Sequence, residues 1–246
     1  MREKAAASRV LAAIDTADLD AAVMHVQRLG SAVAGVKLGL EFYMAHGAPG
    51  YRRVADAFGG AGPAPIFLDL KFHDIPNTVA GAVRAVAPLE PLILNVHASG
   101  GPAMMRAARD AAAESADRLK LRRTLLIGVT VLTSLDDQDL ARVGQSTPAR
   151  EQVLRLADLA RECGLDGVVC SPHEIAPLRA RLGSDFLLVT PGIRPEWASA
   201  GDQKRMMTPA EAVRAGADYL VIGRPITADR DPAQAAGRIA AEIAAA

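Results

Sequence analysis

The sequence predicts an α/β fold, a single-domain (β/α)8 barrel of the TIM-barrel class that spans residues 1–246. Eight short apolar runs are each followed by a segment with helical spacing, and this alternation is typical of a parallel sheet covered by helices. Eight such units in 246 residues match the size of one closed barrel. A doubly wound sheet is the alternative, but it usually carries a glycine-rich turn after its first strand, and residues 15–18 (DTAD) hold no glycine.

Strands and helices are expected to alternate along the whole chain. Apolar runs of four to eight residues, bounded by Gly, Pro, Asp or Ser, predict strands at 9–14, 33–38, 66–70, 92–96, 124–131, 167–170, 186–189 and 219–222. Good helix formers with apolar residues three and four positions apart predict helices at 19–29, 41–58, 79–87, 103–119, 150–163, 173–182, 209–215 and 233–243. No linker or low-complexity tract interrupts this pattern, so one domain accounts for the chain.

Composition and charge exclude several classes of function. The 28 basic residues balance 28 acidic ones, so the chain lacks the positive field that nucleic-acid binding needs, and no nucleic-acid partner is expected. No run reaches the ~18 apolar residues of a membrane span. Residues 1–10 hold no apolar signal segment, so we expect a cytoplasmic protein without membrane contact. The only two cysteines, Cys163 and Cys170, lie in apolar stretches and are expected to be buried.

Charged residues stand at the carboxyl ends of three neighbouring strands, where barrels of this class place their active sites. Asp15 ends the first strand, Lys37 the second, and Asp69 and Lys71 the third, with Asp74 soon after. Because side chains alternate along a strand, Asp69 and Lys71 share the interior face while the leucines at 68 and 70 face the helices. A structural salt bridge would explain one pair but not the charges on the other strands. We therefore expect these five residues to converge on one mouth as a catalytic or binding set.

The loops after the seventh and eighth strands carry the signals of a phosphate site. Gly223 and Arg224 follow the eighth strand, where a glycine lets the backbone approach an anion and an arginine offers a planar fork of donors. Arg194 follows the seventh strand within a stretch, 193–207, that contains Gln203 and is too long for an ordinary turn. Long loops at this end of a barrel are typically lids over the substrate.

Three stretches of the chain resemble the orotidine 5′-monophosphate decarboxylase family. The stretch 68–78 (LDLKFHDIPNT) is similar to the family's signature almost letter for letter, and 189–195 (VTPGIRP) and 221–226 (VIGRPI) resemble its phosphate loops. The resemblance extends from residue 15 to residue 232. Related sugar-phosphate barrels share the bare Asp-x-Lys-x-x-Asp pattern, whereas the Ile-Pro-Asn-Thr extension at 75–78 makes the match specific.

The resemblance implies an enzyme that decarboxylates orotidine 5′-monophosphate to UMP in de novo pyrimidine biosynthesis, as a homodimer and without metal or organic cofactor. It implies that Lys71 donates a proton and is flanked by Asp69 and by Asp74 of the partner subunit. The substrate-binding residues that it implies are Asp15 and Lys37 at the ribose, Thr133 with Ser134 beside it at the pyrimidine, Arg194, Gln203, Gly223 and Arg224 at the phosphate, and Thr78 across the dimer interface.

The chemistry fits these groups without the family name. Loss of CO₂ from C6 leaves a negative charge in the plane of the pyrimidine ring, where neither ring carbonyl accepts it by simple conjugation. A fixed ammonium group such as that of Lys71 stabilises this charge and then protonates C6. Two other functions fit the residues less well: a metal-dependent sugar-phosphate decarboxylase or aldolase in which Asp69 binds Mg²⁺, and a non-catalytic nucleotide-binding regulator. His97, after the fourth strand, also points toward the mouth, where a supporting role is more typical than direct catalysis.

Overall fold

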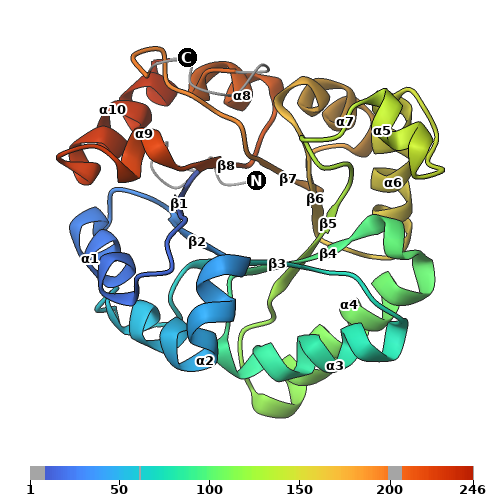
Figure 1. The fold of residues 1–246 in the computed structure, drawn as a ribbon, viewed down its shortest axis with the longest axis horizontal. Coiled ribbons are helices and arrows are strands. Elements are labelled where there is room, and N and C mark those ends of the chain that lie inside the picture. Colours follow the sequence, from blue (N-terminus) through green and yellow to red (C-terminus); the bar gives the residue numbers. More distant parts are fainter. Residues whose placement is uncertain (1–8, 61, 199–206, 246) are drawn as a thin grey trace.

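The fold is a closed barrel of eight parallel strands with helices around it (Figure 1). The computed structural model describes residues 9–60, 62–198 and 207–245. Its strands are β1 Val10–Ile14, β2 Gly35–Gly39, β3 Ile66–Phe72, β4 Ile93–His97, β5 Leu125–Val129, β6 Gly167–Val169, β7 Leu187–Thr190 and β8 Tyr219–Ile222. Each strand pairs with the next along the chain, and β1 pairs with β8 to close the ring. The predicted TIM-barrel class is confirmed.

All eight predicted helices are present, with two further helices in the described residues. The α-helices are α1 Leu19–Leu29, α2 Leu40–Asp56, α3 Pro76–Val86, α4 Pro102–Leu119, α5 Asp137–Arg142, α6 Ala149–Glu162, α7 Ile175–Leu182, α8 Pro209–Ala215, α9 Arg224–Thr227 and α10 Pro232–Ala244. Short 3₁₀ turns span Ala87–Leu89, Ala98–Gly100 and Pro172–Glu174. The sequence pattern did not predict α5 and α9, because six and four residues are too few to show a helical period. No described helix combines the length and apolar character that crossing a membrane requires.

Alternate residues of the strands face two different apolar layers. One layer fills the barrel interior, with Phe67, Ile93 and Val221 among its members. The other layer lies between the strands and the helices and includes Leu68 and Leu70. The prediction that these two leucines face the helices is therefore confirmed, and the strand geometry turns Asp69, between them, into the barrel.

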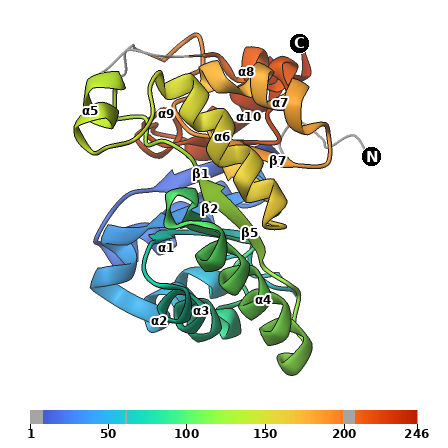
Figure 2. The same cartoon turned by 90° about the vertical axis from the view of Figure 1, so that its right-hand side faces the viewer.

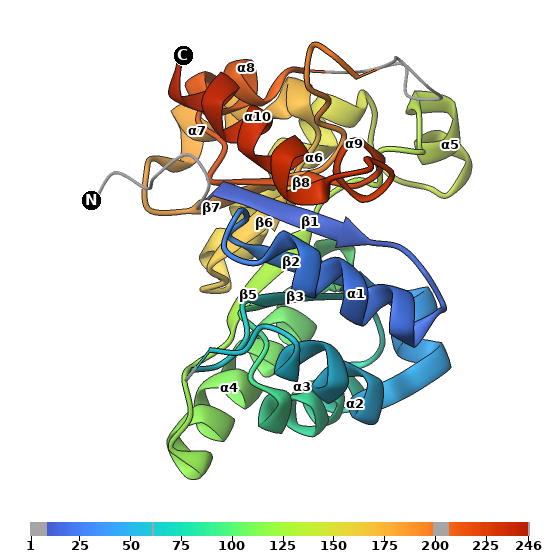
Figure 3. The same ribbon diagram turned by 90° about the vertical axis from the view of Figure 1, so that its left-hand side faces the viewer.

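The carboxyl ends of the strands open at one end of the barrel. Figure 3 shows β1 pointing toward the end of the barrel where α9 and α5 lie. Figure 2 likewise places α5 at one end of the barrel. Because all strands are parallel, every loop that follows a strand reaches this same mouth.

Candidate active site

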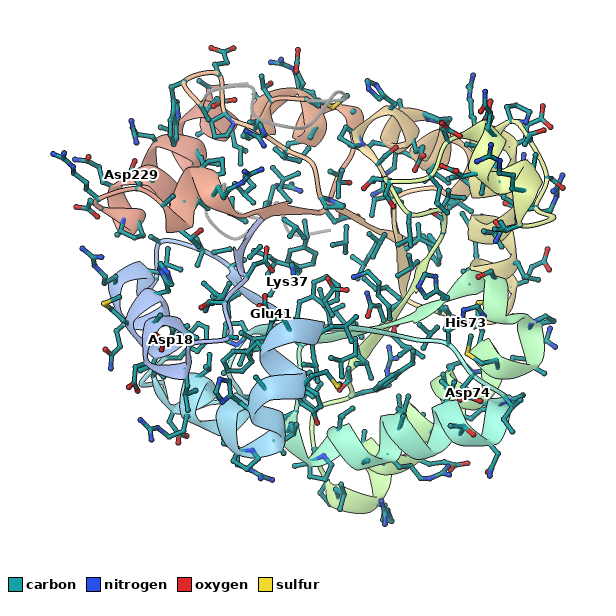
Figure 4. All side chains as sticks on the ribbon, in the orientation of Figure 1. Asp18, Lys37, Glu41, His73, Asp74 and Asp229 are labelled. Carbon is teal, nitrogen blue, oxygen red and sulfur yellow. The ribbon has the colours of Figure 1, made fainter. Side chains whose placement is uncertain are left out.

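Four charged side chains of alternating sign form a row across β1, β2 and β3. Nζ of Lys37, on β2, lies 3.0 Å from Oδ1 of Asp15 and 3.5 Å from Oδ2 of Asp69. Nζ of Lys71, on β3, donates a hydrogen bond to Oδ1 of Asp69 at 2.7 Å. Figure 4 shows Lys37 near the middle of the barrel. The structure thus brings these four residues together, as the pattern at the strand ends predicts.

Asp69 is the centre of this row because it contacts both lysines. Its side chain is only 12% exposed, and Nδ2 of Asn95 on β4 donates to its Oδ1 at 2.7 Å. Burial by itself raises the pKa of the Asp69 carboxyl. The charges of Lys37 and Lys71 and the hydrogen bonds from Lys71 and Asn95 outweigh burial, so this pKa lies below its ordinary value. Asp69 is therefore a carboxylate at neutral pH and pairs with two ammonium groups at once.

The backbone at Lys71 departs from that of a regular strand. Its φ of 49° lies in the left-handed region, which residues with side chains rarely adopt. The pairing register between β3 and β4 shifts between Leu68 and Phe72. The backbone N–H of Lys71 donates to Oδ1 of Asn95 at 2.8 Å. The regular strand alternation assumed from Asp69 to Lys71 is therefore wrong for the backbone, although the two side chains meet as expected.

Asn95 is a site residue that the sequence analysis missed. It is fully buried, and its carboxamide contacts both Lys71 and Asp69. A signal for it exists in the sequence, because it is a polar residue inside an apolar strand. Its neighbours on β4, Leu94 and Val96, belong to the outer apolar layer, so Asn95 faces the interior as Asp69 does.

Two cavities meet at Lys37, Asp69 and Lys71. The first, of about 260 Å³, is also lined by Thr133 and by a mainly apolar set: Phe67, Val129, Val131, Leu132, Val169, Cys170, Pro191 and Val221. The second, of about 230 Å³, has Asp15 and the start of α2 in its wall. The first cavity therefore suits a flat group with an apolar face and a few polar atoms, and the second suits a hydroxylated group beside Asp15 and Lys37. Ser134 lines neither of these two cavities.

Arg194 and Arg224 line a third cavity, of about 330 Å³, together with Trp197 and residues of α9. Arg224 is the first residue of α9 and directly follows Gly223. A Cβ atom at Gly223 would come no closer than 3.6 Å to its neighbours, which is ordinary van der Waals contact, so packing within the chain does not require a glycine there. Two guanidinium groups beside one cavity suit an anion with several oxygens, such as a phosphate.

Backbone contacts join the two ends of the predicted lid, residues 193–207. Ile193 and Met207 form a parallel bridge, and the backbone N–H of Arg194 donates to the carbonyl of Met207 at 3.1 Å. Within the same stretch, the Trp197 ring has the guanidinium of Arg238 3.9 Å from its centroid. Gln203, a predicted phosphate ligand, lies outside the described residues.

Asp74 does not join the charged row within one chain. It is exposed, and its Oδ1 accepts a hydrogen bond from the backbone N–H of Ile75 at 2.6 Å. Figure 4 shows His73 and Asp74 well away from Lys37, beyond the ring of strands. The expectation that Asp74 converges with the other charges is therefore wrong for a single chain, because the segment after β3 turns outward. Thr78, in the first turn of α3, is also exposed. That these two residues act across a dimer interface stays a prediction.

His97 packs against a second histidine at the edge of the site. Its ring centroid lies 5.3 Å from that of His73. Burial lowers the pKa of His97, and the nearby His73 and Lys71 lower it further. His97 lines neither of the two cavities around the charged row. That His97 has a supporting role stays a prediction.

The structure also bears on thiol and metal chemistry. Cys163 and Cys170 are free and buried, as predicted, and burial raises the pKa of the Cys170 thiol to about 12. In the part of the chain that the structure describes, no three His, Cys, Asp or Glu side chains are grouped so that they could hold a metal ion.

Fold and site together define a class of protein. The carboxyl-end mouth of the barrel presents an ammonium group, fixed by a buried carboxylate, at the wall of a largely apolar cavity. Two arginines line a separate cavity at the same mouth, where their guanidinium groups suit an anion. Such a mouth, with a charged row beside an apolar cavity and two arginines at a further cavity, is typical of a barrel enzyme that acts on an anionic substrate.

The chain belongs to the orotidine 5′-phosphate decarboxylase / HUMPS family, whose model matches residues 8–239. An orotidine 5′-phosphate decarboxylase of Rhodospirillum rubrum is 58% identical over 95% of this chain and 93% of its own length. One of Paramagnetospirillum magneticum is 53% identical over 95% of this chain and 97% of its own. The crystal structure of orotidine 5′-phosphate decarboxylase from Lactobacillus acidophilus is 36% identical and covers 96% of this chain and 98% of its own, with a TM-score of 0.83. The resemblance seen in the sequence is confirmed, and the chain is an enzyme of this family.

Proposed function

We propose that this chain converts orotidine 5′-monophosphate to UMP and CO₂ in pyrimidine biosynthesis, with residues 1–246 as one catalytic domain. The observation that carries the proposal is the Lys71 ammonium group, which is fixed at 2.7 Å from Asp69 and lines the apolar cavity. The family and the names of the relatives support the same reaction. A cytoplasmic location, expected from the sequence, is part of the proposal.

In this mechanism the bond between C6 and the carboxylate carbon breaks, and its electron pair stays on C6 while CO₂ leaves. The ammonium group of Lys71 stabilises that pair and then transfers a proton to C6, which yields UMP and a neutral amine that regains its proton from water. Asp69 holds Lys71 in place and stands near the substrate carboxylate, where its negative charge disfavours the bound ground state.

The three cavities support a placement for the rest of the substrate. The pyrimidine occupies the largely apolar cavity beside Thr133, and the ribose lies beside Asp15 and Lys37. The phosphate binds Arg194 and Arg224, with Gly223 and Gln203 as its further ligands. Binding of the remote phosphate closes the loop 193–207 and thereby contributes to the rate.

The test is to incubate the purified chain with orotidine 5′-monophosphate and to follow the loss of substrate absorbance and the release of CO₂. We expect turnover that is unchanged after dialysis against EDTA. Activity lost to EDTA and restored by Mg²⁺ would favour the metal-dependent sugar-phosphate alternative. Binding of UMP without any turnover at micromolar enzyme would favour a nucleotide-binding regulator.

The proposal includes a homodimer in which Asp74 and Thr78 reach the partner's site. Its support is that Asp74 is exposed and turned away from its own charged row, next to Ile75, which is 67% exposed. A closed dimer uses the same surface twice, so each subunit would complete the site of the other.

Subunit mixing tests this shared site. Lys71→Ala and Asp74→Ala proteins are each expected to be nearly inactive and are mixed under conditions that exchange subunits. With random pairing about half of the dimers are mixed, and each of these has one site with both lesions and one intact site, so activity should reach about a quarter of wild type. If exchange is confirmed independently and no activity returns, Asp74 serves its own barrel and the shared site is refuted.

A further inference from the structure

We propose that Asn95 is a positioning residue for this reaction, because its carboxamide fixes the backbone of Lys71 and the carboxylate of Asp69 at the same time. The inference rests on the role proposed above for Lys71. It assigns to Asn95 the task of aiming the Lys71 ammonium group at the reacting carbon, without contact between Asn95 and the substrate.

The two ends of the Asn95 side chain are both engaged. Its Oδ1 accepts the backbone N–H of Lys71 at 2.8 Å, and its Nδ2 donates to Oδ1 of Asp69 at 2.7 Å. Nζ of Lys71 donates to that same Oδ1 of Asp69, also at 2.7 Å. Asn95, Asp69 and Lys71 therefore form a closed ring of contacts that joins the backbone and the ammonium group of a single lysine.

The strand pairing explains why a side chain is needed at this place. Leu68 pairs with Leu94 and Phe72 pairs with Val96, so β3 advances four residues where β4 advances two. The bulge places Lys71 in the left-handed region, out of regular register with the strand. The Oδ1 atom of Asn95 accepts the Lys71 N–H there and so stabilises a backbone conformation that is strained when nothing supports it.

Only an amide of this length meets both demands of the site. The Lys71 N–H needs an acceptor, and the Asp69 carboxylate needs a donor, at two ends of one short planar group. A carboxylate at position 95 would supply the acceptor but place a second negative charge against Asp69. An aliphatic side chain would supply neither and would leave a buried N–H without a partner.

The first test is Asn95→Ala, with Gln152→Ala as the matched control. Gln152 is a buried amide on α6 that lines none of the three cavities, and its Oε1 accepts from Arg155 at 2.8 Å. We expect kcat for orotidine 5′-monophosphate to fall about 100-fold in Asn95→Ala, because a misplacement of about 1 Å in a catalytic group has an effect of that size. The Kd for UMP should stay within about threefold of wild type, since the phosphate and ribose groups are untouched. Gln152→Ala should change neither constant.

The second test is Asn95→Asp, which keeps the shape of the side chain. The kcat of this variant should depend on pH in a way that a simple loss of stability would not produce. At ~pH 8 the introduced carboxylate repels Asp69, and kcat should be reduced about as far as in Asn95→Ala. Near ~pH 5 the introduced carboxyl takes up a proton, because the neighbouring charge raises its pKa, and its O–H restores the donor to Asp69. The ratio of the variant's kcat to that of wild type should therefore rise at least about fivefold between these pH values.

Each outcome decides the matter. If kcat of Asn95→Ala stays within about threefold of wild type, or if UMP binding weakens in parallel with kcat, Asn95 is only a packing residue. If Asn95→Ala does not fold, Asn95→Asp decides, and a kcat ratio that is flat with pH refutes the positioning role. Lys71→Ala separates this failure from that of the proposed function: if it retains wild-type kcat, the role of Lys71 itself is wrong.

Discussion

Replacing Lys71 by alanine should separate chemistry from binding. In the proposed mechanism the change removes a general acid, which contributes ~10²–10⁴-fold, and a fixed charge at the developing anion, which contributes ~10²–10³-fold. We therefore expect kcat to fall at least ~10⁴-fold, a loss of about 5.5 kcal/mol of transition-state stabilisation. The cavity lined by Arg194 and Arg224 has no lining residue in common with the cavity lined by Lys71. The Kd for UMP should therefore change by no more than about threefold, or ~0.6 kcal/mol.

The structure also limits what this variant costs in stability. Asp69 keeps Nζ of Lys37 at 3.5 Å and Nδ2 of Asn95 at 2.7 Å, so it remains paired when Lys71 is gone. The lost contact is one charge-assisted hydrogen bond whose lysine is 30% exposed, and we expect the free energy of unfolding to fall by about 1–2 kcal/mol.

A matched control is Lys120→Ala. Lys120 is an exposed lysine after α4 with a φ of 57°, close to the 49° of Lys71. It therefore reproduces the loss of a lysine from a left-handed backbone outside the site, and kcat should not change. The measurements are the decrease in substrate absorbance for kcat, calorimetric titration with UMP for Kd, and urea unfolding. A loss of UMP affinity as large as the loss of kcat would refute the separation of the two functions.

Three further predictions concern the phosphate, the charged row and the cysteines. Arg224→Ala should lower kcat/KM at least about tenfold on the nucleotide and hardly at all on the phosphate-free nucleoside, and an equal loss on both substrates would place Arg224 outside the phosphate site. Burial raises the pKa of Asp69, but Lys37 and Lys71 lower it by more, so the pKa in the folded protein lies below the ordinary value of 3.8. The contribution of Asp69 to stability is therefore full above 3.8 and is lost as the pH falls through the lowered pKa. Urea unfolding should then show a pH dependence below this value that is weaker in Asp69→Asn, and identical acid slopes would contradict it. Because Cys170 is buried and burial raises the pKa of its thiol to about 12, this cysteine should react with thiol reagents far more slowly in the native protein than in the unfolded chain, and equal rates would be the contrary result.

Much of the fold and of the charged row could be predicted from the sequence because both depend on simple periods. The apolar runs alternate with helical segments, and each predicted strand lies where a strand is found. The alternation of Leu68, Asp69 and Leu70 correctly assigned the aspartate to the interior, because a two-residue period decides the face without any knowledge of tertiary contacts.

Features that depend on strand pairing could not be predicted in this way. The left-handed backbone of Lys71 follows from a register shift against β4, and a register is a property of two strands rather than of one pattern. The outward turn of the segment that carries Asp74 depends on how β3 leaves the barrel. Asn95 could have been predicted, because the two-residue alternation that assigns Asp69 to the interior also assigns Asn95 there. Its signal is a polar residue that interrupts an apolar strand.

The reaction residues and the phosphate arginines occupy separate arcs of the strand ring. Asp15, Lys37, Asp69 and Lys71 follow or lie on the first three strands, whereas Arg194 and Arg224 follow the last two. The arcs adjoin along a single seam, where β1 pairs with β8 and Asp15 stands close to Gly223. On the roles proposed above, the arginines that bind the phosphate and the charged row that acts on the pyrimidine thus come from distant parts of the sequence. On the placement proposed above, a substrate with a different group in place of the phosphate would require changes at Arg194 and Arg224, while the charged row on the first three strands could stay as it is.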